Sequence, residues 1–478
     1  QDSGLGRLET RQRSSAGISG ARCCHTSGKM NAFSAQRFTF SRLASAASLF
    51  VLSACASLPE VDPLLHQAAS RASSDGLLGS RQAASGSHLL EHHVALMEQI
   101  TGSPLASGNQ ASLLYDGPAT YKAMFDAIEK AKDHVNIEFY IIEEDEIGQR
   151  FANLLIKKQR QGVQVNLIYD SLGSNKTSRE YFERLRAAGI RALEFNPVNP
   201  AKALDLNHRD HRKIMIVDGR TAFTGGINIS EVYSSGSSVG SGNSKDAKSP
   251  GWRDTQVAIS GPVVAEFQKL FLATWEKQNG GPLPARNYFP DLKAAGNDLA
   301  RVLGSSPDQP VPTIYVTLLS AIAHAQKTIH ITMAYFVPDR GTTDALKDAA
   351  RRGVDVELIL PSYSDFWAVF HAGRAHYAEL LEAGVKIYER QDALLHSKTI
   401  VIDDVWATVG SSNLDWRSFL HNDEVNAIVL SAGFAKEMEA MFARDLAKSK
   451  EITLDAWRKR GLDVRAKEWA AQIWEYWL

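Results

Sequence analysis

Two stretches of this chain carry the same reactive residues at the same spacing. Each begins with a histidine, has a lysine two residues later and an aspartate five residues after the lysine, and ends with an asparagine. The two sets are His211, Lys213, Asp218 and Asn228, and His396, Lys398, Asp403 and Asn413. One His-x-Lys pair recurs by chance in long chains, and one copy alone would equally fit an ordinary edge hairpin. Two copies that agree at five positions over eighteen residues argue against that alternative.

These residue types suit a phosphodiester. Lysine ammonium groups and asparagine amides can bind the non-bridging oxygens, where negative charge gathers in the transition state. A neutral histidine can attack phosphorus, and a protonated one can give a proton to the leaving oxygen near neutral pH. The neighbouring lysines would repel a cation, so we expect neither a metal site nor a cofactor.

The first motif also predicts its own local geometry. The apolar run Lys213–Val217 reads as a buried strand, and residues two apart in a strand share a face, so His211 and the lysine point the same way, roughly 6.6 Å apart. Asp218-Gly219 is a turn signal that would fold Gly225–Asn228 back beside the histidine, with two glycines that let a ligand approach the backbone. The aspartate lies roughly 16 Å beyond the lysine along an extended strand, so we predict that it orients or stabilises the turn. Asp403 is assigned the same role.

An alternation of helices and strands surrounds the first motif. Helical periodicity predicts helices over 89–100, 121–132, 151–160 and 180–188, and apolar runs predict strands over 135–142, 163–169 and 190–195. Such alternation predicts an α/β fold with a parallel or mixed sheet. The order then returns about 190 residues later, where the segment 353–359 repeats the pattern of 162–168. A period of that length indicates a duplicated domain.

The predicted halves span 86–281 and 312–478, joined by a linker over 282–311 that is punctuated by glycine and proline. A Ser/Gly-rich insertion at 234–250 occurs only in the first half. A flexible surface loop is the favoured interpretation, and a lid over the site is the alternative.

The N-terminal region predicts export and anchoring. Residues 1–29 are interpreted as an upstream or artificial segment, 30–54 as a lipoprotein signal peptide with two arginines before an apolar run, and 55–85 as a flexible tether. Leu-Ser-Ala-Cys resembles the bacterial lipobox, which makes Cys55 the predicted lipidation site; a short uncleaved hydrophobic tail is the alternative. We therefore expect a lipoprotein of the bacterial cell envelope that faces the periplasm, with the outer membrane favoured because Ala56 follows the cysteine.

Composition limits the kinds of partner and of covalent or metal site that we expect. A formal net charge of -1 gives no overall attraction for nucleic acid, and no nucleic-acid partner is expected. All three cysteines lie in the first 55 residues, so the rest of the chain holds neither disulfide nor thiolate metal site.

The paired motifs, with Gly-Gly-x-Asn and Gly-Ser-x-Asn at their ends, resemble the phospholipase D superfamily. The resemblance spans nearly all of the chain after about residue 86. Further segments are similar to bacterial cardiolipin synthases: 207–213, 252–255, 335–338, 383–388, 395–398 and 413–418. The resemblance implies two tandem phospholipase D-like domains, each a mixed sheet flanked by helices, related by a pseudo-twofold axis with both motifs in one active site.

The resemblance also assigns roles to residues. It implies a phosphohistidine intermediate, with His211 as nucleophile and His396 as general acid, although the near symmetry leaves the reverse assignment open. The phosphate would be held by Lys213, Lys398, Asn228 and Asn413. An acidic residue after each motif would orient a histidine, and these positions hold Asp254, where the insertion alters the spacing, and Glu424.

The function implied is that of a membrane-anchored phosphatidyltransferase of cardiolipin synthase type, acting on phospholipids such as phosphatidylglycerol. The alternatives are a phospholipase D hydrolase, an endonuclease and a non-catalytic lipid-binding lipoprotein. Any partner protein is left open.

Several other residues receive predictions. His208 lacks the lysine of the motif and is interpreted as structural or substrate-flanking. Arg209 and Arg253 are predicted to solvate the surface, with contact to a lipid headgroup as the alternative. The C-terminal residues Trp469, Ile473 and Trp477 have helical spacing. Core packing is favoured for them over an interfacial anchor.

Overall fold

The computed structural model describes residues 97, 101–198, 207–236 and 251–478. The predicted upstream segment, signal peptide, Cys55, tether and, apart from Met97, the helix over 89–100 lie outside the described residues, as does most of the insertion. The described residues all belong to one compact unit.

The first half contains alternating strands and helices. In chain order these are β1 (Ala106–Tyr115), α5 (Asp116–Lys130), β2 (His134–Phe139), α6 (Glu146–Arg160), β3 (Gln164–Asp170), α7 (Arg179–Ala187), β4 (Arg191–Phe195), β5 (Arg209–Asp210), β6 (Lys213–Val217), β7 (Thr221–Gly225), η3 (Glu231–Tyr233), β8 (Trp252–Arg253), β9 (Thr255–Ser260) and α8 (Val264–Lys277). The helices and strands predicted for residues 121–195 are confirmed, with ends displaced by a few residues.

The second half repeats the series and adds elements at its C-terminal end. In order these are β10 (Asp298–Ser305), α9 (Thr313–His324), β11 (Thr328–Met333), α10 (Arg340–Arg351), β12 (Asp355–Pro361), α11 (Trp367–Ala375), α12 (Tyr377–Glu382), β13 (Lys386–Arg390), β14 (Leu394–Leu395), β15 (Lys398–Ile402), β16 (Trp406–Gly410), α13 (Trp416–Leu420), β17 (Asn422–Leu430), α14 (Ala432–Leu446), β18 (Ser449–Ile452), α15 (Leu454–Arg458), α16 (Leu462–Gln472) and η4 (Glu475–Trp477).

Local sequence explains where several helices begin. The carboxylate of Asp145 accepts the Gly148 N–H at the start of α6, and the Ser178 hydroxyl accepts the Tyr181 N–H at the start of α7. Each cap satisfies a backbone donor that the first turn leaves unpaired. Strands β2, β3 and β6 are buried at every residue, because helices and neighbouring strands enclose them.

One 16-stranded sheet runs through both halves. Fifteen strands follow the order β18-β13-β12-β11-β15-β16-β17-β10-β1-β9-β7-β6-β2-β3-β4, and β5 pairs with β17 off this path. Outward from the antiparallel β1–β10 pair, the first half reads β1-β9-β7-β6-β2-β3-β4 and the second reads β10-β17-β16-β15-β11-β12-β13, so the two halves match strand for strand. The outer strands β2, β3 and β4 pair in parallel, whereas β6, β7 and β9 pair antiparallel. The fold is therefore the predicted duplicated α/β arrangement with a mixed sheet.

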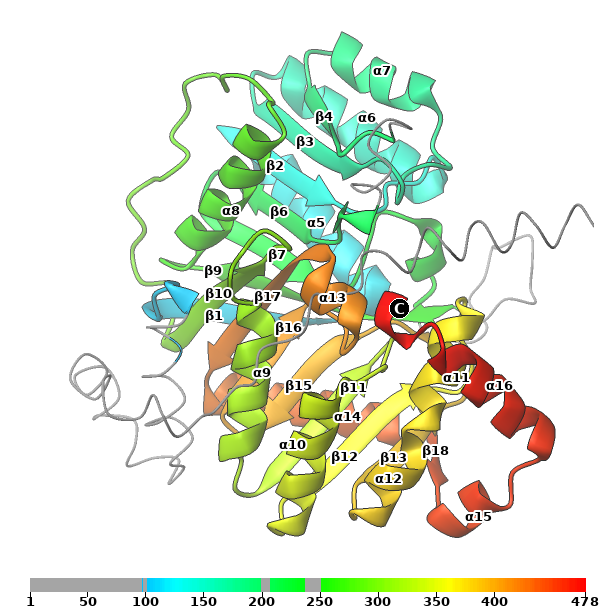
Figure 1. Cartoon of the computed structure of the whole chain (residues 1–478). Coiled ribbons are helices and arrows are strands. Elements are labelled where there is room, and N and C mark those ends of the chain that lie inside the picture. The colour runs from blue at the N-terminus through cyan, green and yellow to red at the C-terminus, as the bar shows by residue number, and fades with distance from the viewer. Residues whose placement is uncertain (1–96, 98–100, 199–206, 237–250) are drawn as a thin grey trace, which may run out of the picture. The chain divides into compact units, whose positions relative to one another are not determined.

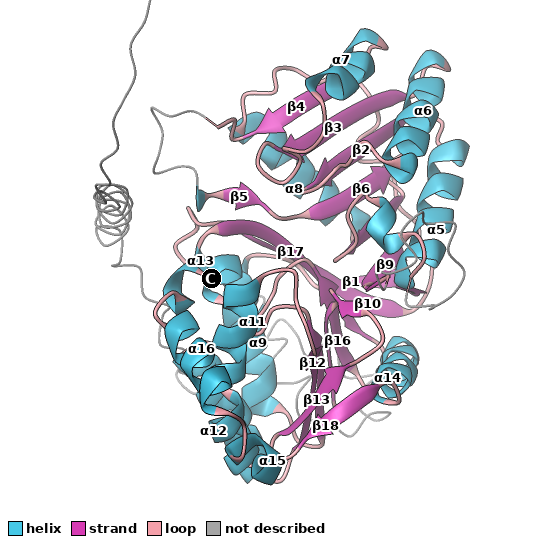
Figure 2. Ribbon diagram, turned by 90° about the vertical axis from the view of Figure 1, so that its right-hand side faces the viewer, coloured by secondary structure: helices cyan, strands magenta, loops and turns pink. Residues whose placement is uncertain are grey.

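Helices cover the sheet and close its cores. In the second half α9, α11 and α12 lie on one side of the strands and α14 on the other (Figures 1 and 2). One hydrophobic core combines Phe267 of α8, Phe434 of α14 and strand residues of both halves, so the halves share buried apolar surface. The predicted linker 282–311 contains β10, which pairs with β17, so this range also supplies a strand. The domain boundaries themselves stay predictions. Among the described residues, no helix combines the length and apolarity needed to cross a bilayer.

Candidate active site

Each histidine motif starts a hairpin. In the first half β6 pairs antiparallel with β7, and the register Ile214↔Thr224 places Gly225 next to the lysine end of β6. Asp218 and Gly219 form the turn with φ of 54° and 62°, values that aspartate and glycine tolerate. The second half repeats this with β15 and β16, and Asp403 has a φ of 53°. The predicted strand, turn and return strand are confirmed.

The two motif aspartates lie at the turn ends of these hairpins. The carboxylate of Asp218 accepts the backbone N–H groups of residues 132, 133 and 134, at 2.8–3.1 Å. Asp403 accepts those of residues 326, 327 and 328. Each carboxylate thereby ties its turn to the start of strand β2 or β11. Neither makes a hydrogen bond to a motif histidine or lysine, so they do not join the cluster described next.

The opposite ends of the hairpins meet across the boundary between the halves. The two-residue strand β5, just before His211, pairs in parallel with the start of β17, and the histidine N–H donates to the Asp423 carbonyl at 2.9 Å. The equivalent strand of the second half is β14, just before His396. It pairs with β8 of the first half, and the His396 N–H donates to the Arg253 carbonyl at 2.8 Å. Each histidine is therefore held against a strand of the other half.

The same pairing delivers a carboxylate to each imidazole. His211 Nδ1 lies 2.9 and 3.0 Å from the two carboxylate oxygens of Glu424. His396 Nδ1 lies 2.7 Å from Asp254 Oδ2. Both acids are fully buried. Sequence analysis selected these two acids, but it did not predict that each would contact the histidine of the opposite half.

Burial and the nearby lysines keep both imidazoles neutral. Burial lowers the pKa of His211 to about 4, although Glu424 opposes the shift. The pKa of His396 is also lowered, first by burial and then by Lys398. In a neutral ring whose Nδ1–H donates to a carboxylate, the lone pair resides on Nε2. The geometry thus presents two nucleophilic nitrogens.

The motif lysines are buried beside the histidines. Lys213 Nζ donates to the His211 carbonyl at 2.6 Å, and Lys398 donates to the His396 carbonyl. Burial lowers the pKa of Lys213 to about 7 and that of Lys398 to about 8. The charge of the second lysine further lowers the pKa of the first. The two motifs share one site, because each motif histidine is hydrogen-bonded to the carboxylate of the opposite half.

Tyrosines that sequence analysis missed line this site. The Lys213 ammonium lies 5.2 Å from the ring centre of Tyr140, which also packs edge-on against His211 at 5.0 Å. Tyr335 takes the corresponding place near Lys398, at 6.0 Å, and lies edge-on to His396 at 6.2 Å. Tyr140 is the first tyrosine after β2, which pairs with β6, and Tyr335 is the first after β11, which pairs with β15. The equivalent positions in the two halves are the sequence signal that could have found these tyrosines.

The two asparagines have different surroundings. Asn228 Oδ1 accepts the Ile141 N–H at 3.1 Å and its Nδ2 donates to the Tyr233 hydroxyl, which lies 3.4 Å from His396 Nδ1. Within the described residues, Asn413 Oδ1 is buried without a hydrogen-bond partner. The first amide is therefore committed to protein groups, and the second retains an unused acceptor.

Sequence analysis predicted that the glycines near Asn228 make room for a ligand. That prediction is wrong, because other groups of the protein occupy the space beside them. A Cβ on Gly226 would meet the Asp254 carboxylate at 2.2 Å, so the carboxylate occupies the space that a side chain would fill. The second half has Ser411 at this position, and its hydroxyl donates to Glu424. The two acids are thus held differently.

Both predicted surface arginines are buried, which corrects that prediction. Arg253 is 0% exposed, forms an ion pair with Asp445 at 2.7 Å and lies 4.0 Å from the ring centre of Tyr115. Arg209 is 1% exposed and donates to Ser171 and to backbone carbonyls. An interior guanidinium needs several acceptors. Those of Arg209 come from its own half, whereas Arg253 joins the two halves through Asp445.

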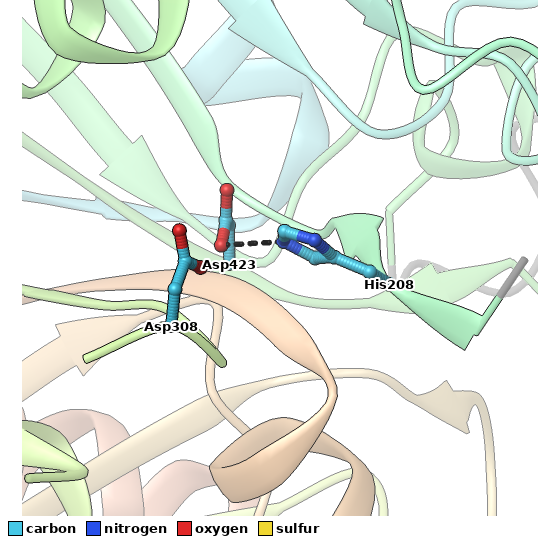
Figure 3. A group of neighbouring side chains, drawn as sticks. All are labelled: His208, Asp308 and Asp423. Atoms are coloured by element: carbon cyan, nitrogen blue, oxygen red, sulfur yellow. Dashed lines mark hydrogen bonds and ion pairs between the residues drawn. The ribbon is translucent and has the colours of Figure 1, made fainter. Parts of the chain in front are cut away.

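One group of histidine and acidic residues within the described chain has metal-like spacing: His208, Asp308 and Asp423 (Figure 3). His208 Nε2 is hydrogen-bonded to Asp423 Oδ1 at 2.9 Å. Asp308 is paired with the Lys277 ammonium at 2.7 Å. Because that ammonium already neutralises Asp308, the arrangement is a polar network between the halves. His208 has the structural position that the sequence predicted as one of two options.

Comparison with known proteins places these features in a family. Residues 124–236 and 318–446 match the family described as "Cardiolipin synthase, PLD-like domain". The chain is 36% identical over 389 residues to cardiolipin synthase from Geobacillus sp. (strain WCH70), covering 80% of this chain and 76% of that protein. It is 36% identical over 376 residues to cardiolipin synthase 2 from Bacillus anthracis, covering 78% and 71%. The crystal structure of phosphatidylserine synthase from Haemophilus influenzae superposes with a TM-score of 0.59 at 14% identity, over 80% of this chain and 99% of that one, which supports the fold alone.

Proposed function

This chain belongs to the phospholipase D-like cardiolipin synthase family, and on that premise we propose that it transfers a phosphatidyl group from one phospholipid to the glycerol hydroxyl of another. The donor is of the phosphatidylglycerol type. The observation that carries the proposal is the pair of imidazoles, each with Nδ1 against a buried carboxylate of the opposite half. No nucleotide is needed, since one phosphodiester replaces another.

The first step forms a phosphohistidine. His211 Nε2 attacks phosphorus, and the bond from phosphorus to the headgroup oxygen breaks. The negative charge of the bound phosphodiester raises the pKa of His396, so its Nε2 carries a proton when the donor is bound, with Asp254 against Nδ1. His396 gives this Nε2 proton to the headgroup oxygen, which releases glycerol. Glu424 stabilises the positive charge that the attacking imidazole acquires, because the two groups are 2.9 Å apart.

The second step restores the enzyme. The glycerol hydroxyl of a second phosphatidylglycerol attacks the phosphohistidine, and its proton passes to His396. The P–N bond breaks and cardiolipin leaves. The phosphate anion is bound by Lys213 and Lys398; its negative charge raises the pKa of both ammonium groups above the values of the empty site, so both are cationic when substrate is present.

A product assay tests the reaction. Purified protein is incubated with radiolabelled phosphatidylglycerol vesicles, and the lipids are separated by chromatography. Cardiolipin and glycerol in equal amounts are expected. Phosphatidic acid without cardiolipin would assign the protein as a hydrolase and refute the transferase proposal. The variants His211→Ala and His396→Ala should each be inactive, with His324→Ala, at the C-terminal end of α9, as a matched histidine control.

We also propose that Cys55 is lipidated and anchors the enzyme in the bacterial envelope, facing the periplasm. The support is the Leu-Ser-Ala-Cys segment that follows an apolar run. Mass spectrometry of the mature protein should find an acylated N-terminal peptide. An unmodified Cys55 in protein isolated from membranes would rule the anchor out.

A further inference from the structure

Large apolar side chains are exposed on two helices near the C-terminus. Helices α11 and α16 pack together through a small core that includes Val369, Ala372 and Ala471. Of the ten exposed large hydrophobic residues in the described chain, six lie on or beside these helices. They are Phe366 (49% exposed), Trp367 (53%), Leu462 (79%), Trp469 (68%), Ile473 (64%) and Trp474 (47%), and we call them the aromatic surface.

The exposure of Trp469 and Ile473 corrects the core packing predicted for these two residues; the side chain of Trp477 lies outside what the structure describes. Leu462, Ala466, Trp469 and Ile473 follow one another at intervals of four, three and four residues, so they form one stripe on the solvent side of α16. The opposite side buries Glu468, which pairs with Arg460 at 2.9 Å. A helix that buries its acid and exposes its apolar stripe lacks a covering partner among the described residues.

The aromatic surface borders the active site. Asp365 immediately precedes Phe366, and its carboxylate accepts the Tyr335 hydroxyl at 2.7 Å. The ring of that tyrosine is edge-on to His396. One tyrosine and one hydrogen bond therefore connect the exposed aromatics to the histidine.

A second contact connects the other end of α16 to the site. The ring centres of Tyr476 and Trp416 lie 5.5 Å apart. Trp416 is the first residue of α13 and comes three residues after Asn413. In Figures 1 and 2 the C-terminus lies close to α13, and η4 contacts that helix. The surface and the phosphate-binding motif are thus on adjoining parts of the second half.

We propose that the aromatic surface docks on the face of a phospholipid bilayer and so places the active site over its substrates. The inference rests on the proposed function, because the acyl chains of a phosphatidyl donor and acceptor remain in a bilayer. Tryptophan side chains suit the boundary between acyl chains and water, since the ring is apolar and its N–H is polar. Exposed Arg465 on α16 supplies positive charge for an anionic lipid such as phosphatidylglycerol, whereas Lys467 lies 3.9 Å from the Asp463 carboxylate, which offsets part of its charge.

Vesicle binding tests the proposal in the full chain. Cys55→Ala is included in every protein so that acylation does not contribute. The double variant Trp469→Ala/Ile473→Ala is compared with Phe289→Ala, a residue of the 282–311 segment with 49% exposure. Sedimentation with phosphatidylethanolamine–phosphatidylglycerol vesicles should show about tenfold weaker binding for the double variant and no change for the control.

Three further measurements separate docking from chemistry and from folding. Transfer from short-chain phosphatidylglycerol below its micelle concentration should be unchanged in the double variant, because a dissolved substrate needs no docking. Arg465→Ser/Lys467→Ser should weaken binding to anionic vesicles and leave binding to phosphatidylcholine vesicles unchanged. Thermal unfolding should match the parent, since the replaced side chains are exposed.

Each alternative outcome has a distinct meaning. Unchanged vesicle binding in the double variant would overturn the docking proposal. A shift from dimer to monomer with unchanged vesicle binding would also overturn it and assign the surface to a second copy of the chain. If the parent makes no cardiolipin but the double variant still loses vesicle binding, docking stands and the proposed function fails.

Discussion

Replacing Glu424 by glutamine removes a buried charge from His211 while preserving the shape of the side chain. The glutamine can still contact the ring nitrogen, so packing and the β5–β17 pairing are retained. What is lost is the electrostatic stabilisation of the imidazole once it bonds to phosphorus and becomes positively charged. The chemical step should slow, and substrate binding should change little.

The separation in the structure gives the magnitude. Nδ1 and the carboxylate oxygen are 2.9 Å apart. Unit charges centred about 4 Å apart at an effective dielectric constant of about 20 interact by about 4 kcal/mol. Each 1.36 kcal/mol changes a rate about tenfold, so kcat should fall about 10³-fold. The exposed Glu437→Gln, on α14, is the matched control and should retain the parent rate.

A substrate with a good leaving group assigns the two histidines. Phosphatidyl-p-nitrophenol releases an anion that needs no proton, so an acid catalyst contributes little. With this substrate Glu424→Gln should keep its full loss, whereas Asp254→Asn, which acts on His396, should recover most of its activity. The released nitrophenolate is followed by absorbance in a stopped-flow instrument.

Two results would refute this reasoning. A Glu424→Gln enzyme within tenfold of the parent would show that the cross-half carboxylate does not act on the rate-limiting chemistry. A full loss for Asp254→Asn together with recovery for Glu424→Gln would make His396 the nucleophile.

Three further predictions concern packing, turns and pH. Asp218→Ala leaves three backbone N–H groups without their acceptor and should lower the free energy of unfolding by about 3 kcal/mol, as measured in urea. Gly226→Ala places a methyl group against the Asp254 carboxylate and should lower kcat more than tenfold, whereas Ser411→Ala only removes a hydrogen bond and should lower it less. The pKa of His211 is about 4 in the folded state, below the usual value of 6.5. As pH drops from 7, the unfolded chain therefore protonates this histidine before the folded chain does. The free energy of unfolding should fall by about 3 kcal/mol between pH 7 and pH 4.

Each of these has its control and its contradicting result. The exposed Asp291→Ala should unfold like the parent, and an equal loss in both variants would discredit the turn assignment. Equal kcat values for Gly226→Ala and Ser411→Ala would mean that the carboxylate adapts freely. For the pH effect, His211→Gln should show a correspondingly shallower loss of stability, and an unchanged slope would assign the acid sensitivity to other groups.

The sequence predicted the parts of the site that local patterns encode. A buried strand with a histidine and lysine two residues apart, an Asp-Gly turn and a small-residue return strand are short-range signals, and the hairpins β6–β7 and β15–β16 follow them. The duplicated order of elements predicted two equivalent halves. The resemblance to a family, rather than any spacing, selected Glu424 and Asp254.

The contacts between the halves were not predictable in this way. The pairs β5–β17 and β8–β14 are only two residues long and join segments more than 140 residues apart, so no periodicity marks them. Arg209 and Arg253 were placed on the surface because arginine is usually exposed, but acceptors contributed from distant parts of the chain bury both. For Trp469 the helical spacing was correct and the direction of the apolar stripe was not, since periodicity does not tell which face meets solvent.

The exchange of carboxylates between halves has a consequence for symmetry. A dimer of two identical halves would surround both imidazoles with the same groups, because a twofold axis makes each environment a copy of the other. Joined in one chain, the halves can differ, and here Gly226 faces one acid while Ser411 donates to the other. Nucleophile and proton donor require unlike environments. Fusion into a single polypeptide frees the two copies to specialise while each still depends on the other.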